Sequence, residues 1–251
     1  MRPTSSPTLL VFTLGAPRES ARRPLVPADL RELEIVLRQE CLTAALAAGR
    51  ACGCRLEVAS PTPLGLPEDA RNFPQQGRDF GARLERAMAD AFARGAGPLL
   101  IVGSDVPGLS ARHLDDALSL LDADGDPERV VIGPSPDGGF YLLASRRPVE
   151  GLAGAARWCR PETLRDLLRS LQAAGRPVTL LAPLDDLDHP ADLERWLAVS
   201  TADARWRRPT ARLRRALARR LRPLRLPPPG QLRASFVPVL AGRAPPLPLS
   251  Q

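Results

Sequence analysis

The sequence predicts an α/β fold in which helices cover both faces of a mostly parallel central sheet. Short apolar segments alternate along the chain with longer segments whose apolar residues have helical spacing. Residues 99–102 (LLIV) form a continuous apolar run, which is typical of a central parallel strand that is covered on both faces. The chain has 251 residues, of which 44% are hydrophobic, and is long enough for one sizeable α/β core and an appendage.

The first part of the chain contains two expected strands and two expected helices before residue 99. The apolar run at residues 8–14 predicts the first strand. Leucine and valine recur at helical spacing over residues 28–50, where glycines end the helix. Residues 54–60 predict a second strand, and a loop rich in proline and glycine follows. Residues 76–83 open the next helix, because apolar residues continue at helical spacing beyond them.

The second part continues the alternation. The serine before residues 111–122 is a good N-cap for a helix over that range. Residues 130–133 and 139–144 predict two strands around a turn of glycine and proline. A helix with four leucines on one face follows Thr163, and residues 177–184 predict the last strand.

Charge changes sharply near residue 200. The net charge of the chain is +7, but residues 205–251 contain 12 arginines and no acidic residue, whereas residues 1–204 are mildly acidic. We therefore expect a domain over residues 1–200 and an arginine- and proline-rich basic tail over residues 201–251, partly helical or disordered. The leucines of the tail recur four apart between arginines, which favours a weak contact with an anionic surface, while a loosely ordered tail is the simpler interpretation.

Membrane insertion, secretion and zinc binding are not indicated. No apolar run approaches the ~20 residues of a transmembrane segment, and the run near the N-terminus lacks a small-residue cleavage pattern. The four cysteines lack the spacing of a zinc site. The expected location is the cytoplasm.

Carboxylates follow three of the expected strands. Asp105 comes directly after residues 99–102, Asp137 lies in the glycine-rich turn, and Asp186 and Asp188 follow the last strand. Ligands of open α/β sheets bind outside the carboxyl ends of the strands, and carboxylate oxygens suit Mg²⁺ or Mn²⁺. Closely spaced like charges raise one another's pKa unless a cation neutralises them. A metal site and ordinary solvated turns are the two interpretations.

Four segments, in this order, resemble a known family. They are QQGRDFGARLERAM (residues 75–88), GSDVP (residues 103–107), GPSPDGGFYLL (residues 133–143) and DLDHPADL (residues 186–193). They look like the motifs of a bacterial GT-A-type glycosyltransferase-like family of arsenosugar biosynthesis, a branch of the nucleotide-diphospho-sugar transferase superfamily. The resemblance covers roughly residues 8–198. It implies a Rossmann-like three-layer sandwich that binds a nucleotide.

The resemblance also implies roles for individual residues. Nucleotide and phosphate binding would involve Arg18, Arg22, Gln76, Gly77, Arg83 and Ser104. The sugar or acceptor would contact Asp137, Gly138, Gly139 and Trp158. Asp105, Asp186 and Asp188 would hold Mg²⁺ or Mn²⁺, and Asp105 and Asp137 would serve catalysis, with Asp137 as the base.

Two segments depart from the family pattern. The loop over residues 15–27, which grips the phosphates in nucleotidyltransferases of this fold, has one glycine and three arginines, Arg18, Arg22 and Arg23. Cys159 and Arg160 stand where the family has other residues. For the arginines, a phosphate contact and a solvated charge are equally acceptable interpretations.

Three functions follow as hypotheses. The first is a metal-dependent glycosyltransferase that moves a sugar from a nucleotide sugar to an unknown small-molecule acceptor. The second is a nucleotidyltransferase acting on a nucleoside triphosphate and a phosphorylated acceptor, which needs a basic loop at residues 15–27. The third is a catalytically degenerate binding or scaffold protein, motivated by the departures from the family pattern.

Overall fold

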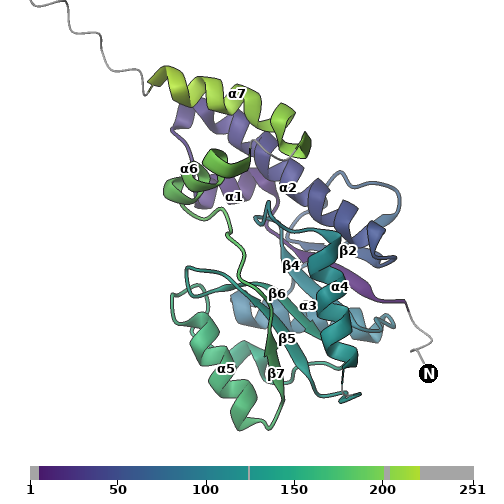
Figure 1. The fold of residues 1–251 in the computed structure, drawn as a ribbon. Helices are drawn as coiled ribbons and strands as arrows, with labels where there is room; N and C mark the ends of the chain where they lie inside the picture. The colour runs from purple at the N-terminus through teal and green to yellow at the C-terminus, as the bar shows by residue number, and fades with distance from the viewer. Residues whose placement is uncertain (1–5, 124, 201–203, 221–251) are drawn as a thin grey trace, which may run out of the picture.

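A computed structural model describes residues 6–123, 125–200 and 204–220 (Figure 1). Within these residues the expected α/β fold is confirmed: seven strands form one sheet in the order β3-β2-β1-β4-β6-β5-β7. The strands are β1 (Thr8–Phe12), β2 (Arg55–Ser60), β3 (Ala70–Pro74), β4 (Leu99–Gly103), β5 (Val130–Pro134), β6 (Phe140–Ser145) and β7 (Val178–Leu180). β6 pairs antiparallel with both of its neighbours, and the other pairs are parallel.

Helices cover both faces of the sheet. The described α-helices are α1 (Ala16–Arg22), α2 (Arg31–Ala51), α3 (Phe80–Ala93), α4 (Ala111–Asp122), α5 (Thr163–Ala173), α6 (Pro190–Val199) and α7 (Ala204–Arg220), with short 3₁₀ turns η1 (Ala28–Leu30) and η2 (Leu152–Gly154). α2 and α4 pack their leucines and alanines against one face of the sheet. α3, η2 and α5 cover the other face, so the fold has the three expected layers.

A third apolar cluster lies beyond the carboxyl edge of the sheet (Figure 1). It joins α2, α6 and α7, and within it the rings of Trp196 and Trp206 meet edge to face with their centroids 5.0 Å apart. Leu187 belongs to the same cluster and is completely buried. This cluster therefore anchors the loop that precedes α6, in which two of the candidate carboxylates lie.

Two local expectations were wrong, and one strand was not expected. The segment 15–27 is not all loop, because it contains α1, whose first turn carries Pro17. The residues between β2 and α3 include the edge strand β3, which pairs in parallel with β2. The last strand is β7, a short strand, and residues 181–189 run on without regular structure.

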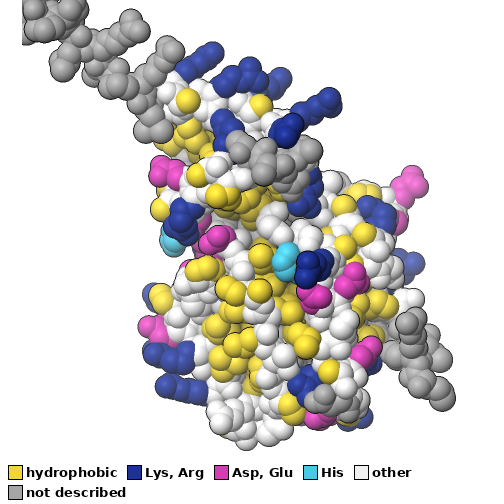
Figure 2. Space-filling view, in the orientation of Figure 1, with side chains coloured by type: hydrophobic (Ala, Val, Ile, Leu, Met, Phe, Trp, Pro, Cys, Tyr) yellow, Lys and Arg dark blue, Asp and Glu magenta, His cyan; other side chains and the backbone are white. Residues whose placement is uncertain are grey.

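Helix α7 is strongly basic on its exposed side, which Figure 2 shows as a group of dark blue side chains. The exposed arginines are Arg205, Arg207, Arg208, Arg212, Arg215 and Arg219. The opposite side carries Trp206 and Leu213, which are 2% and 1% exposed. The expected contact with an anionic surface and the domain boundary near residue 200 stay predictions, and residues 221–251 of the expected tail lie outside the described residues. None of the described helices is both long and apolar enough to span a membrane.

Candidate active site

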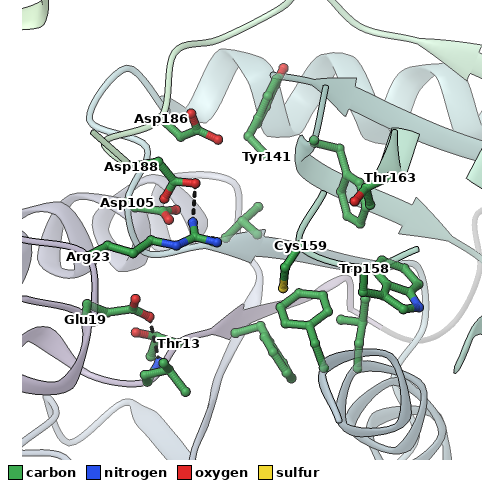
Figure 3. Close-up of a pocket in the computed structure, with 18 of the residues that line it drawn as sticks. Thr13, Glu19, Arg23, Asp105, Tyr141, Trp158, Cys159, Thr163, Asp186 and Asp188 are labelled. Carbon is green, nitrogen blue, oxygen red and sulfur yellow. Dashed lines mark hydrogen bonds and ion pairs between the residues drawn. The ribbon is translucent and has the colours of Figure 1, made fainter. Parts of the chain in front are cut away.

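A cavity of about 180 Å³ opens at the edge of the sheet where the parallel strands end (Figure 3). Its walls come from the ends of β1 and β4, the end of α1, the start of α3, the turn between β5 and β6, the loop before α5 and the loop before α6. Because β6 is antiparallel, its first residues, rather than its last, lie at this edge. The strand order therefore brings together segments that are far apart in the chain.

Four aspartates reach this cavity. Asp105 follows β4, and its backbone oxygen accepts a hydrogen bond from the nitrogen of Leu187 at 2.9 Å, which ties its loop to the loop before α6. Carboxylate oxygens of Asp137, Asp186 and Asp188 all lie within 4.8 Å of one another. Oxygen atoms at this spacing suit a hard divalent cation, and the donor set is of the kind that Mg²⁺ or Mn²⁺ prefers. We call these four residues the acidic cluster.

Burial and mutual repulsion change how the acidic cluster titrates. Burial, followed by the charges of Asp188 and Glu19, raises the pKa of Asp105 to about 8. Burial and the charges of Asp137 and Asp188 raise the pKa of Asp186 to about 7. Without a cation, Asp105 is therefore mostly protonated at neutral pH and Asp186 about half protonated, whereas a bound cation would favour their ionised forms.

Arginines surround the acidic cluster. Arg23, directly after α1, forms an ion pair with Asp188 (Figure 3). Burial lowers the pKa of Arg23, but the charge and hydrogen bond of Asp188 outweigh this effect and raise it. Arg22, Arg83 and Arg160 also line the cavity, and within the described residues their guanidinium groups form no ion pair with a carboxylate. These three cations are available to an anionic ligand.

The cavity has an aromatic wall opposite the acids. Phe80 contacts both Phe12 and Trp158 with ring centroids 5.4 Å apart, and Phe140 lies 6.1 Å from Trp158. The indole nitrogen of Trp158 donates to the backbone oxygen of Ala153 at 2.9 Å, which fixes the ring. An aromatic wall of this kind can hold a base or a sugar ring, since ring faces stack on aromatic side chains.

The glycines of the β5–β6 turn serve the docking of the next loop. Gly138 has a φ of +90°, and a Cβ atom built there would lie 1.9 Å from the backbone oxygen of Pro161. Its own carbonyl accepts a hydrogen bond from the nitrogen of Leu164 at 2.8 Å. Asp137 accepts from the nitrogen of Gly139 at 2.8 Å, which leaves its second oxygen for a ligand.

The structure places eight of the residues singled out from the sequence in the wall of the cavity: Arg22, Arg83, Asp105, Asp137, Gly139, Trp158, Asp186 and Asp188. Others lie elsewhere. Arg18, Gln76 and Gly77 are exposed outside the wall, and Gly138 lies behind it. Ser104 is buried, and its hydroxyl donates to the hydroxyl oxygen of Thr13 at 2.7 Å, an arrangement that joins the ends of β1 and β4.

Sequence reasoning missed some residues of the cavity. Glu19 lines it and accepts a hydrogen bond from the nitrogen of Leu14 at 2.9 Å. Arg160 was taken only as a departure from a pattern, although it lines the cavity. Gln75, rather than Gln76, contacts the strand ends, since its amide donates to the backbone oxygens of Thr13 and Ala59. No periodicity separates Gln75 from its neighbour, so the sequence held no signal for it.

Comparisons with known proteins bear on the family and the fold of this chain. The model of a family described as "Uncharacterized protein conserved in bacteria (DUF2064)" matches residues 33–160. A phosphoenolpyruvate guanylyltransferase of Sphaerobacter thermophilus is 33% identical over 180 residues, covering 68% of this chain and 81% of the relative. A crystal structure of a candidate nucleotide-diphospho-sugar transferase from Desulfovibrio desulfuricans G20 superposes with a TM-score of 0.70 and 24% identity, covering 85% of this chain and 96% of the other. That structure shares the fold.

Proposed function

We propose that this chain, which belongs to the DUF2064 family, is a metal-dependent nucleotidyltransferase that joins a nucleoside triphosphate to a phosphorylated acceptor. The main support is that one cavity holds a carboxylate triad together with three arginines that form no ion pair within the described part of the chain. The relationship to a phosphoenolpyruvate guanylyltransferase supports the same reaction class. This was the second of the hypotheses drawn from the sequence, and it now has more support than sugar transfer.

A divalent cation fits the acidic cluster on the chemistry of the residues themselves. The cation would be held by Asp137, Asp186 and Asp188, with Asp105 beside them. These residues already attract one positive charge, because the guanidinium of Arg23 pairs with Asp188. When bound, Mg²⁺ or Mn²⁺ would neutralise phosphate charge and stabilise a leaving pyrophosphate. We therefore propose Mg²⁺ or Mn²⁺ as the cofactor.

The chain's own residues then position the two substrates. Arg22, Arg83 and Arg160 pair with phosphate oxygens, for which guanidinium groups are suited by charge and shape. An oxygen of the acceptor phosphate forms a bond to the α-phosphorus, the bond between the α-phosphorus and its bridging oxygen to the β-phosphate breaks, and pyrophosphate leaves. The attacking oxygen is already ionised near pH 7, because the second pKa of a phosphate ester is about 6. This reaction therefore requires no general base.

Pyrophosphate release tests the proposal. The full chain is incubated with GTP, ATP, CTP or UTP, with Mg²⁺ or Mn²⁺, and with small phosphorylated acids including phosphoenolpyruvate. We expect release that requires both an acceptor and the cation, and that falls at least about 100-fold in Asp186→Asn. Asp185→Asn is the matched control, because Asp185 is exposed outside the cavity wall and should leave release unchanged. Absence of release with every triphosphate would refute the proposal.

Sugar transfer is the second candidate, and the aromatic wall is the observation that favours it. Phe80, Phe140 and Trp158 offer a stacking surface beside the acidic cluster. An acceptor hydroxyl is not ionised at neutral pH, so this reaction needs a base, and Asp137 would provide it. Release of a nucleoside diphosphate from a nucleotide sugar, lost in Asp137→Asn, would identify this activity. Cation binding without either release would favour the binding or scaffold hypothesis.

A further inference from the structure

We infer that Arg23 is the resident counter-cation of the acidic cluster, which the divalent cation displaces and which then pairs with the phosphates of the nucleotide. This inference rests on the metal site of the proposed function and adds an exchange of cations to it. The observation behind it is that Arg23 pairs with Asp188, one of the three carboxylates placed to share a cation. The two partners come from segments 165 residues apart in the chain.

The Arg23 side chain is well placed within the acidic cluster. Figure 3 shows its guanidinium directed at Asp188 beside Asp105, and the charges of both aspartates act on it. The side chain of Asp188 is only 11% exposed, whereas that of Arg23 is 33% exposed. Asp188 is therefore largely removed from water, and it depends on a nearby positive charge more than Arg23 depends on a negative one.

A buried ion pair holds the backbone at Arg23 and just after it. Glu34 and Arg38, successive turns of α2, are 0% and 4% exposed and pair at 2.9 Å. The second oxygen of Glu34 accepts from the nitrogen of Leu25 at 3.0 Å, and Nη2 of Arg38 donates to the backbone oxygen of Arg23 at 2.7 Å. These bonds fix the main chain around Arg23, so the movement left to it is rotation of its side chain.

This arrangement makes the divalent cation and Arg23 compete for Asp188. A cation that takes the Asp188 oxygen paired with Arg23 must displace the guanidinium, and a cation that takes the other oxygen still meets its positive charge beside the same carboxylate. In both cases the cation binds less tightly than the carboxylates alone would allow. Arg23 loses a partner in this step unless an anion enters the same cavity, and a nucleoside triphosphate supplies that anion. Binding of the cation and of the triphosphate should therefore favour each other, and the coupling must be equal in both directions.

Titration with Mn²⁺ alone tests the competition. Mn²⁺ binding to the full chain is measured by electron paramagnetic resonance, with no nucleotide present, for the wild type, Arg23→Gln and Arg23→Met. We expect both variants to bind Mn²⁺ about tenfold more tightly than the wild type, the effect of removing a partly buried competing charge. Arg22→Gln is the matched control, because Arg22 lines the same cavity without a carboxylate partner in the described part of the chain, and it should leave the affinity for Mn²⁺ alone unchanged.

A second titration tests the coupling. A triphosphate with a non-hydrolysable α,β-methylene bridge should tighten Mn²⁺ binding in the wild type several-fold more than in Arg23→Gln or Arg23→Met. Since Arg23 is one-third exposed, its removal should not unfold the chain, and a melting curve checks this. Unchanged or weaker Mn²⁺ affinity in both variants, or no Mn²⁺ binding by any of the chains, would overturn the inference. Altered affinities without pyrophosphate release would refute the proposed reaction but not the role of Arg23.

Discussion

Replacing Asp105 with asparagine should stabilise the metal-free protein while abolishing its activity. The pKa of Asp105 is raised from 3.8 to about 8, chiefly by burial and then by the charge of Asp188. At neutral and higher pH, folding must therefore either protonate this carboxyl or bury its charge. Asparagine has nearly the same shape and no charge. The bond from Leu187 is retained because it is made to the backbone oxygen.

The sign and the size of this effect follow from the two pKa values. Below pH 3.8 the carboxyl is protonated in both the folded and unfolded states, so its ionisation does not lower the free energy of unfolding. As the pH rises from 3.8 to about 8 the folded state binds more protons than the unfolded state, and stability falls. At ~1.4 kcal/mol per pKa unit, the shift from 3.8 to about 8 can lower the free energy of unfolding by at most ~5–6 kcal/mol. The cavity is open to water, and solvent and Arg23 screen the charge, so we expect about 1–2 kcal/mol at pH 8.

Thermal unfolding in the presence of a chelator measures this effect. For a chain of this size a gain of 1–2 kcal/mol raises the melting temperature by about 3–6 °C. Asp105→Asn should show this rise at pH 8 and a clearly smaller one at pH 5, while Asp185→Asn should shift the melting temperature by less than about 1 °C at either pH. Of these two variants, only Asp105→Asn should lose pyrophosphate release. A lower melting temperature for Asp105→Asn, or an equal rise at both pH values, would refute the argument from burial.

Three further predictions concern other parts of the site. Burial and the charges of Asp137 and Asp188 raise the pKa of Asp186 to about 7. The affinity for Mn²⁺, measured by calorimetry, should therefore increase steeply from pH 6 to pH 8 and then level off. An affinity that does not change with pH would contradict this prediction. Gly138→Ala places a Cβ against the carbonyl of Pro161 at a φ of +90°, so it should lower the free energy of unfolding in urea by about 2–4 kcal/mol. Gly154→Ala is the control, because a Cβ there meets no atom within 4 Å. An equal loss of stability in the two variants would disprove the docking role of Gly138. Trp206→Ala removes a ring that is 2% exposed, so it should lower the free energy of unfolding by about 3–5 kcal/mol and weaken Mn²⁺ binding. Trp206→Phe should lose less stability and less Mn²⁺ affinity. Normal Mn²⁺ binding in a folded Trp206→Ala protein would show that α7 does not support the loop before α6.

Local patterns predicted most of the elements. The helix at residues 111–122 has the same bounds as α4, because its N-cap serine and its leucines lie within one short segment. Helix α1 was missed because it has only seven residues and contains a proline, and its contacts with α2 come from the fold. Strand β3 was missed because its residues do not alternate between apolar and polar, and the free edge of β2 provides its partners.

The arrangement of the site required the tertiary structure. From the sequence, Asp105 was grouped with Asp186 and Asp188 as metal ligands, yet the three carboxylates that lie within 4.8 Å of one another include Asp137 instead of Asp105. This grouping arises because β6 runs antiparallel, which brings the turn before it to the carboxyl edge of the parallel strands. The short turn between β5 and β6 requires these two strands to be antiparallel, but the pattern of apolar and polar residues does not say which of the two is reversed relative to the rest of the sheet.

Periodicity, turn residues and the position of acids after strands were sufficient to identify the fold class and to place carboxylates at its ligand-binding edge, because each of these signals lies within about ten neighbouring residues. The identity of the carboxylates that can share a cation, and the presence of Arg23 among them, depended on strand order and on the buried Glu34–Arg38 pair. Distances between side chains on separate strands are set by how the strands are arranged in the sheet, and spacing along the chain carries no record of them.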